Sequence, residues 1–293
     1  MYVTNLDLAL SRKLKEDLIN QGFEMLQPEH TAFQGKKKSL TVTLYKSGKL
    51  VVQGKESPDF IEFYLEPELL KSVQFTHPAA QHDTTPRIGV DEAGKGDFFG
   101  PLVIAGVYGG KEEIEKLLKM GVADSKTLND GTIAKIAKQI RQEIPHQIVR
   151  INPHKYNEIY PKFGNLNLLL AWGHATVIAA LAEETGCTQA LVDQFSAQPH
   201  VLNALKRKGV KINLEQRTKA ESDPLVAAAS ILARDGFVSG LEKISQDCQI
   251  PLPKGASDKV LQCGKNIYRS RGLEIFDTIA KKHFKTMSQI LGS

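Results

Sequence analysis

The sequence predicts an α/β protein in two parts, a small α+β unit followed by a larger domain in which strands alternate with helices. The first observation is the segment 39–54, where two runs of alternating apolar and polar residues meet at Lys46-Ser47-Gly48, as in a β-hairpin. The second is the chain after residue 87, where short apolar runs typical of strands precede longer runs with helical periodicity. Such alternation is typical of a sheet flanked by helices.

The composition agrees with a folded protein of this kind. A chain of 293 residues with 41% hydrophobic residues can fill two domains or one large one. The three cysteines are far apart and lack the spacing of a zinc site, which indicates free thiols in a reducing compartment. The first residues show no secretion signal, and no apolar run is expected to be long enough to span a membrane. We expect a cytoplasmic protein without a membrane partner, and we expect it to be a monomer.

Residues 1–72 are predicted to form the small unit. Leu8–Asn20 has apolar residues on one side and charges on the other, which predicts a helix that ends near Gly22. The hairpin of residues 39–54 follows, and residues 66–73 are expected to form a closing helix. The segment 34–55 carries six lysines and no acidic residue. Because a nucleic acid is a polyanion, this unit is a candidate for binding one.

Residues 73–86 are predicted to be a linker. This stretch is polar and aperiodic and contains Pro78 and Pro86. His77 and His82 could bind a metal ion, but solvated linker histidines are the more common case. We therefore assign no chemistry to this segment.

Residues 87–293 are predicted to form a single α/β domain. The strands are expected at residues 87–90, 102–108, 147–151, 189–192 and 211–214. The helices are expected at residues 111–119, 130–143, 165–184 and 223–244, and the last third of the chain is expected to be mostly helical. The basic residues after Ile250 outnumber the acidic ones, which favours a second surface for a polyanion.

The segment around Asp91 and Glu92 carries the most information about function. An apolar strand ends in these two carboxylates and is followed at once by Gly94-Lys95-Gly96. Carboxylates at a strand end can hold a hard divalent cation, and the glycines allow backbone N–H groups to approach a sugar or phosphate. Gly89–Lys95 also fits the start of a phosphate-binding loop, but Gly96 stands where that motif needs a hydroxyl residue. A nucleoside-triphosphatase is therefore disfavoured.

Two further acidic residues stand at comparable positions. Asp193 ends the apolar run 189–192, and Asp223 opens the predicted helix 223–244. Each has a structural alternative, since Asp223 could cap the helix and Asp193 could begin a turn. Residues just past the carboxyl ends of strands tend to gather at one edge of a sheet, where such carboxylates would repel each other unless cations lay between them. Oxygen ligands favour Mg²⁺ or Mn²⁺, and paired ions of this kind cleave phosphodiesters. The residues alone indicate a metal-dependent nuclease or phosphotransferase acting on nucleic acid.

A series of ordered motifs is similar to those of the type 2 ribonuclease H group. They are Asp91 to Gly96, Gly100-Pro101-Leu102, Asp124-Ser125-Lys126, Val192-Asp193, Asp223-Pro224 and Ala227 to Arg234. The Gly-Lys-Gly turn and the segment Asn165 to His174 resemble the ribonuclease HIII branch of that group. The stretch 41–55 resembles the strand–turn–strand of the TATA-binding-protein-like domain that this branch carries ahead of its catalytic domain.

The resemblance implies a ribonuclease H-like catalytic domain with a mixed sheet and flanking helices, preceded by a small α+β TATA-binding-protein-like domain. It implies a Mg²⁺-dependent endonuclease, with Mn²⁺ as an alternative ion, that cuts the RNA strand of RNA–DNA hybrids and leaves 5′-phosphate and 3′-hydroxyl ends. The residues carried over as metal-binding catalytic acids are Asp91, Glu92, Asp193 and Asp223. Those expected to contact substrate are Gly94, Lys95, Gly96, Lys126, Arg217 and Lys219, with a solvated loop as the alternative account of Arg217 and Lys219.

The sequence departs from the related ribonuclease HII pattern in its later region. Members of that branch use a tyrosine there to recognise an RNA–DNA junction, whereas this chain has Pro251-Leu-Pro-Lys-Gly-Ala256 and Tyr268 in an unrelated context. We therefore expect cleavage within RNA tracts rather than at a single embedded ribonucleotide. A noncatalytic nucleic-acid-binding protein and a DNA-directed nuclease of the same fold are the alternatives.

Overall fold

The computed structural model describes residues 1–71, 82–122, 125, 128–193 and 199–292. Within it the chain divides into two compact units, residues 1–81 and 82–293, and each is considered by itself. The predicted linker 73–86 falls mainly on residues 72–81, which lie outside the described part of the chain.

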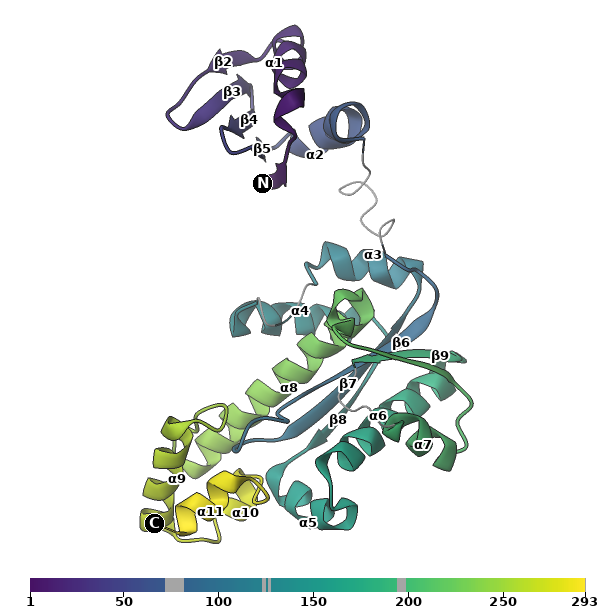
Figure 1. The fold of residues 1–293 in the computed structure, drawn as a ribbon, viewed down its shortest axis with the longest axis vertical. Helices are drawn as coiled ribbons and strands as arrows, with labels where there is room; N and C mark the ends of the chain where they lie inside the picture. Colours follow the sequence, from purple (N-terminus) through teal and green to yellow (C-terminus); the bar gives the residue numbers. More distant parts are fainter. Residues whose placement is uncertain (72–81, 123–124, 126–127, 194–198, 293) are drawn as a thin grey trace. The chain divides into compact units, whose positions relative to one another are not determined.

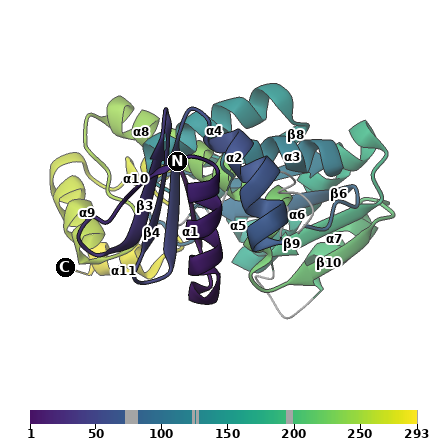
Figure 2. The same ribbon diagram turned by 90° about the horizontal axis from the view of Figure 1, so that it is seen from above.

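The first unit is an antiparallel sheet covered by helices. Its strands are β1 (Tyr2–Asn5), β2 (Glu24–Leu26), β3 (Thr31–Lys37), β4 (Leu40–Tyr45) and β5 (Lys49–Gly54), in the order β1-β5-β4-β3-β2. The helical segments are η1 (Leu8–Leu10), α1 (Ser11–Asn20), α2 (Ser57–Phe60) and η2 (Ile61–Leu70). Leu14 and Leu18 of α1 are fully buried in the core that this helix forms with the sheet, and Figure 2 shows α1 lying beside β3 and β4. This is the predicted α+β unit, and β4 and β5 are its predicted hairpin.

The second unit has a mixed five-stranded sheet between two layers of helices. The strands are β6 (Arg87–Ala93), β7 (Leu102–Gly109), β8 (His146–Ile151), β9 (Gln189–Asp193) and β10 (Asn213–Arg217), in the order β10-β9-β6-β7-β8. Strand β7 runs antiparallel to both of its neighbours, β6 and β8, whereas β9 runs parallel to β6 and to β10. The predicted mixed sheet with flanking helices is confirmed.

Helices cover both faces of this sheet (Figure 1). One face carries α5 (Pro153–Phe163), α6 (Leu166–Thr185) and α7 (His200–Arg207), and the other carries α3 (Lys111–Lys119), α4 (Asp130–Glu143) and α8 (Pro224–Cys248). The chain ends in α9 (Asp258–Arg271), α10 (Phe276–Ile279) and α11 (Lys285–Leu291).

Glycines allow the two long helices to approach the strands closely. A Cβ on Gly89 of β6 would stand 2.5 Å from the backbone of Leu225 in α8. On the other face, a Cβ on Gly173 of α6 would stand 2.8 Å from the side chain of Ile104. Because successive residues of a strand point to opposite faces, Ile88 and Val90 pack on the α6 side of β6 while Gly89 faces α8.

The two long helices correct one expectation from the sequence. Leu166–Thr185 and Pro224–Cys248 are long and apolar enough to cross a membrane by length and composition. Half of the most apolar window in the first and 72% of that in the second are buried inside the unit. They are apolar all round because sheet and neighbouring helices cover them, as expected for core helices.

Candidate active site

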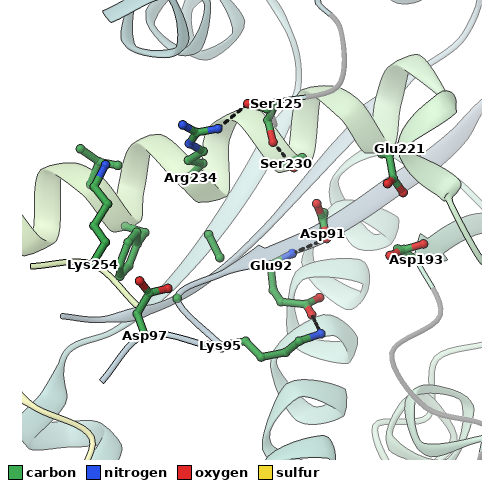
Figure 3. Close-up of a pocket in the computed structure, with 15 residues that line it drawn as sticks. Asp91, Glu92, Lys95, Asp97, Ser125, Asp193, Glu221, Ser230, Arg234 and Lys254 are labelled. Atoms are coloured by element: carbon green, nitrogen blue, oxygen red, sulfur yellow. Dashed lines mark hydrogen bonds and ion pairs between the residues drawn. The ribbon is translucent and has the colours of Figure 1, made fainter. Parts of the chain in front are cut away.

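The carboxyl ends of β6 and β9 define one pocket of about 450 Å³. Because these strands are parallel, Asp91 and Glu92 at the end of β6 and Asp193 at the end of β9 reach the same edge of the sheet. Figure 3 shows these side chains with the other residues that line the pocket, among them Gly94 to Asp97, Ser125, Glu221, Ser230, Arg234 and Lys254. The predicted gathering of Asp91, Glu92 and Asp193 is thus present.

The alternation of side chains along β6 gives Asp91 and Glu92 different surroundings. Asp91 lies on the α8 side, where the hydroxyl of Ser230 acts to lower its pKa, and its Oδ1 accepts a hydrogen bond from the backbone N–H of Glu92 at 2.8 Å. Burial, together with the neighbouring charge of Glu92, raises the pKa of Asp91 to about 7. The apoprotein therefore holds a carboxyl whose ionisation a nearby cation would favour.

Glu92 points to the α6 side and is held at both oxygens. Its Oε2 lies 3.0 Å from Nε2 of His174, a fully buried side chain of α6, and its Oε1 accepts a hydrogen bond of 2.9 Å from Nζ of Lys95. Burial acts to raise the pKa of Glu92, but His174 and Lys95 outweigh it and lower the pKa to about 2. Glu92 is ionised and fixed in position. His174 is a residue whose contact with Glu92 was not predicted, since it entered the prediction only as the last residue of the segment Asn165 to His174.

Asp193 is tied to the segment that supplies another acid. Its Oδ1 accepts a hydrogen bond of 3.1 Å from the backbone N–H of Ala220, the first residue of the short helical segment η5 (Ala220–Ser222). The next residue, Glu221, lines the pocket with Asp193 (Figure 3). Glu221 was not predicted as a site residue, although it stands only two residues before Asp223, which was.

The predicted placement of Asp223 in the cluster is contradicted by the structure. Asp223 is buried at the start of α8, and its Oδ1 caps the helix by accepting from the backbone N–H groups of Leu225 (2.9 Å) and Val226 (3.3 Å). Its Oδ2 accepts from the guanidinium of Arg87, which is buried beside it, and Arg217 lies 3.7 Å away. The carboxylate is turned away from the pocket because the helix end and Arg87 satisfy it. Asp223 therefore has the structural role of a helix cap, which was the alternative to a catalytic role.

The Gly94-Lys95-Gly96 turn lines the same pocket. Gly94 has a φ of +87°, and a Cβ there would stand 2.2 Å from the carbonyl oxygen of Pro101, so the fold itself requires glycine. Gly96 is different, because a Cβ there would meet none of the described heavy atoms within 4 Å. The turn is held from the far side by Asp97, whose Oδ1 accepts from the backbone N–H of Gly255 at 2.6 Å.

Among the remaining predicted substrate contacts, Arg217 and Lys219 do not line this pocket. Lys126 lies outside the described residues. Arg217 is half exposed and pairs with Glu215 and Asp223 at 3.7 Å. Lys219 lines a neighbouring cavity of about 440 Å³, which shares Glu221 with the first.

The donor set of the main pocket fits a hard divalent cation. Asp91, Glu92, Asp193 and Glu221 offer oxygen ligands from three separate elements to one open space. Among the described residues, no three acidic, histidine or cysteine side chains lie closely enough together to form a metal site as they stand. The acids share the pocket, while Glu92 is engaged with His174 and Lys95.

Comparison with known proteins agrees with this picture. The family model described as ribonuclease HII matches residues 88–287, and a domain of unknown function (DUF3378) matches residues 1–75. The chain is 56% identical over 291 residues to a ribonuclease HIII of Protochlamydia amoebophila, covering 99% of this chain and 97% of the relative. It is 50% identical to that of Chlamydia felis, covering 100% and 98%.

Solved structures show the same fold. One is Bst-RNase HIII in complex with Mn²⁺, which superposes with a TM-score of 0.68 at 29% identity and covers 99% of this chain and 98% of that one. Another is the RNase H3 of Aquifex aeolicus, with a TM-score of 0.58, 26% identity and coverage of 96% and 99%. Both span the two units described above.

Proposed function

Since the chain belongs to the ribonuclease HIII family, we propose that it is an endoribonuclease that cleaves the RNA strand of RNA–DNA hybrids with divalent cations. The observation that carries the proposal is the single pocket in which carboxylates from β6, β9 and η5 face the Gly94-Lys95-Gly96 turn. Acidic residues beside a turn that a sugar-phosphate chain can approach are what hydrolysis of a nucleic acid requires.

Asp91, Glu92, Asp193 and Glu221 are the residues that would hold the cations. We propose Mg²⁺, and the Mn²⁺ complex of Bst-RNase HIII supports the use of a divalent ion. Two such ions would lower the pKa of an attacking water and stabilise the leaving oxygen, which yields 5′-phosphate and 3′-hydroxyl ends.

The protein's own groups fix this arrangement. His174 holds Glu92 from the core side, and the hydrogen bond from Ala220 to Asp193 keeps η5, and with it Glu221, beside β9. Lys95 balances the charge of Glu92 and is half exposed, so it can turn to a substrate phosphate. The backbone of Gly94 to Gly96 would approach the 2′-hydroxyls, which only the RNA strand has.

We also propose that the protein is a cytoplasmic monomer and that residues 1–72 bind the hybrid. Five of the six lysines in 34–55 are exposed, which supports a phosphate-binding surface. The exception is Lys37, whose Nζ donates to the carbonyl oxygen of Gln21 at 2.6 Å. Sedimentation of the purified protein would test the monomer, and fractionation of the source cells would test the compartment.

A direct assay uses end-labelled RNA–DNA hybrid, duplex DNA and duplex RNA, each with Mg²⁺, with Mn²⁺ and with EDTA. We expect cleavage of the RNA strand of the hybrid only, dependent on the ion, with ends that a polymerase can extend. A hybrid with one embedded ribonucleotide should be cut poorly, because the loop after α8 brings Lys254 rather than a tyrosine to the pocket. Cleavage of duplex DNA, or equal cleavage in EDTA, would refute the proposal.

A further inference from the structure

The pocket has a basic end opposite the carboxylates of Asp193 and Glu221. Arg234 of α8 and Lys254 of the loop that follows α8 line it, and the hydroxyls of Ser125 and Ser230 lie 2.8 Å apart on the same wall. In Figure 3 these two cations lie on the left of the pocket, and Asp193 and Glu221 lie on the right. Asp97 also lies on the left, where its Oδ1 accepts a hydrogen bond from the backbone N–H of Gly255. The pocket therefore passes from an acidic end through hydroxyls to an end that holds two cations and one carboxylate.

One carboxylate joins the two basic side chains. Asp130, the first residue of α4, accepts from Arg234 through Oδ1 at 2.9 Å and from Lys254 through Oδ2 at 2.6 Å. The side chains of Asp130 and Lys254 are 43% and 46% exposed, and that of Arg234 is 29% exposed. The contact with Lys254, followed by that with Arg234, lowers the pKa of Asp130, so its carboxylate is charged at neutral pH.

We propose that Arg234 and Lys254 form a second phosphate site, which binds a phosphodiester of the hybrid next to the one that the carboxylates act on. The guanidinium of Arg234 and the ammonium of Lys254 each donate to a different oxygen of the Asp130 carboxylate. The same two donors can bind two oxygens of a phosphate. Asp130 pairs with both cations in the free protein, and a phosphate of the bound nucleic acid displaces it from them. The site rests on the proposed function, since it is part of the same pocket.

Further hydrogen bonds hold Arg234 and Lys254 at the wall of the pocket. A second nitrogen of the Arg234 guanidinium donates to the carbonyl oxygen of Ser125, which fixes the side chain at the pocket wall. Lys254 is fixed through its neighbour Gly255, whose backbone N–H and carbonyl bond to Asp97 and to the N–H of Phe98. The cations are thus positioned relative to the Gly94-Lys95-Gly96 turn.

A purely structural tie between α4 and the loop is the competing account. Partly exposed ion pairs contribute little to stability, so they connect α4 to the loop only weakly. The two accounts differ in sign for one substitution. If Asp130 competes with a phosphate, then Asp130→Asn should strengthen hybrid binding, whereas loss of a tie should leave it unchanged or weaken it.

The test measures hybrid binding in EDTA, so that no cleavage occurs, over a series of salt concentrations. Lys254→Gln should weaken binding by about tenfold, the size expected for one charge-assisted contact. It should also reduce the slope of log K against log salt by about 0.9, the share of one duplex phosphate. Asp130→Asn should strengthen binding severalfold, and the double variant Asp130→Asn with Lys254→Gln should lose that gain.

The matched controls come from an ion pair on the same helix as Arg234. Lys243 and Asp247 are 2.8 Å apart, are 60–70% exposed, and do not line the pocket. Lys243→Gln changes the net charge as Lys254→Gln does, and Asp247→Asn changes it as Asp130→Asn does. Their effects on binding measure the contribution of the protein's total charge alone. Thermal melting of each variant identifies any loss of folded protein.

The outcomes separate the two levels of the proposal. If Lys254→Gln and Asp130→Asn behave as their controls do, or if Asp130→Asn weakens binding, the phosphate site is refuted while the nuclease proposal stands. If the unmodified protein neither binds nor cleaves hybrid, the proposed function itself fails.

Discussion

Glu221 and Asp223 are two residues apart, yet they face different surroundings. Asp223 is buried, and its two carboxylate oxygens accept hydrogen bonds from the backbone at the start of α8 and from the guanidinium of Arg87. Glu221 lines the pocket beside Asp193. The difference arises because η5 makes one short turn before α8 begins, so residues in this stretch point in different directions. At the scale of single residues, the acid that this stretch contributes to the pocket is therefore Glu221 rather than Asp223.

This leads to a prediction about the two acids. Glu221→Gln should lower the rate of hybrid cleavage by at least about tenfold and leave the melting temperature unchanged, because one proposed metal ligand is removed from an open pocket. Asp223→Asn should instead lower the free energy of unfolding by about 3 kcal/mol, since it removes the buried counter-ion of Arg87 and leaves only the exposed carboxylate of Asp83 at 3.6 Å. Cleavage rates per folded molecule and thermal melts distinguish the effects. A stable Asp223→Asn protein without activity would return Asp223 to the catalytic set.

A second prediction concerns the glycines of the turn. Gly94→Ala should destabilise the protein by more than about 1 kcal/mol, because the left-handed φ and the carbonyl oxygen of Pro101 both exclude a side chain. Gly96→Val should leave the melting temperature nearly unchanged, since a Cβ there meets open space. It should still weaken cleavage of the hybrid if the backbone at Gly96 contacts ribose. Normal cleavage by a folded Gly96→Val protein would exclude that contact.

At the scale of elements, the C-terminal helices brace the loop that follows the turn. The backbone N–H groups of Gly100 and Lys281 donate to the carbonyl oxygens of Ile279 and Phe98 at 3.0 and 2.9 Å. The Nζ of Lys281 is buried and donates to the carbonyl oxygen of Gly100 at 2.7 Å. Residues 98–100 are thus held by a segment about 180 residues later in the chain.

The burial of Lys281 predicts a pH-dependent stability. Burial lowers the pKa of Lys281 from its ordinary value of 10.5 to about 7. Between these two pH values the unfolded chain binds the proton and the folded protein does not, so the contribution of Lys281 to stability rises with pH. It is fully present above pH 10.5 and disappears as the pH falls through 7.

The measurement compares the native protein with Lys281→Met by chemical denaturation from about pH 6 to about pH 10, which spans the interval between the two pKa values. The difference in unfolding free energy should shift in favour of the native protein as the pH rises. Groups that titrate equally in both proteins cancel in this difference. A difference that does not change with pH would show that Lys281 keeps its proton in the folded state.

At the scale of the whole molecule, we expect the first unit to bind the hybrid and the second unit to cleave it. The first unit has its own core, in which α1 packs on the sheet, and its exposed lysines are concentrated on β3 to β5 and the turns beside them. The second unit contains every residue of the carboxylate pocket. Binding to a long hybrid and cleavage are therefore separable by substitution.

The corresponding prediction uses the intact chain. Changing Lys36, Lys46 and Lys49 together to Gln should weaken hybrid binding and reduce the salt slope by up to about 2.7, at roughly 0.9 for each phosphate that is no longer neutralised. The maximal rate at saturating hybrid should stay unchanged, because the carboxylate pocket is untouched. As a control of equal charge, Arg12, Lys13 and Lys15 on α1 are changed to Gln. An equal effect of both triple variants would show that only the total charge matters.

Much of the fold follows from local sequence. The predicted helices 111–119 and 130–143 coincide with α3 and α4, and the two long apolar helices agree within a few residues at each end. Hydrophobic periodicity predicts such elements because it reflects a buried face. The elements missed were those with weak periodicity, namely β1 to β3 and the helices α5 and α7; α5 contains Pro153 and Pro161 and α7 is short. The closing helix of the first unit begins earlier than expected, at Ser57.

By itself, the sequence determined that Asp91, Glu92 and Asp193 stand at strand ends, because an apolar run that stops at a carboxylate is a local property. Their meeting at one edge of the sheet was expected from the sequence, but it depends on the parallel pairing of β6 with β9, which is tertiary. Only the tertiary structure decided the partners of these groups. His174 holds Glu92 across 82 residues of chain, Arg87 holds Asp223 across 136, and Lys254 reaches Asp130 across 124. Such contacts depend on how the layers pack, and a buried charge takes whichever partner that packing brings to it.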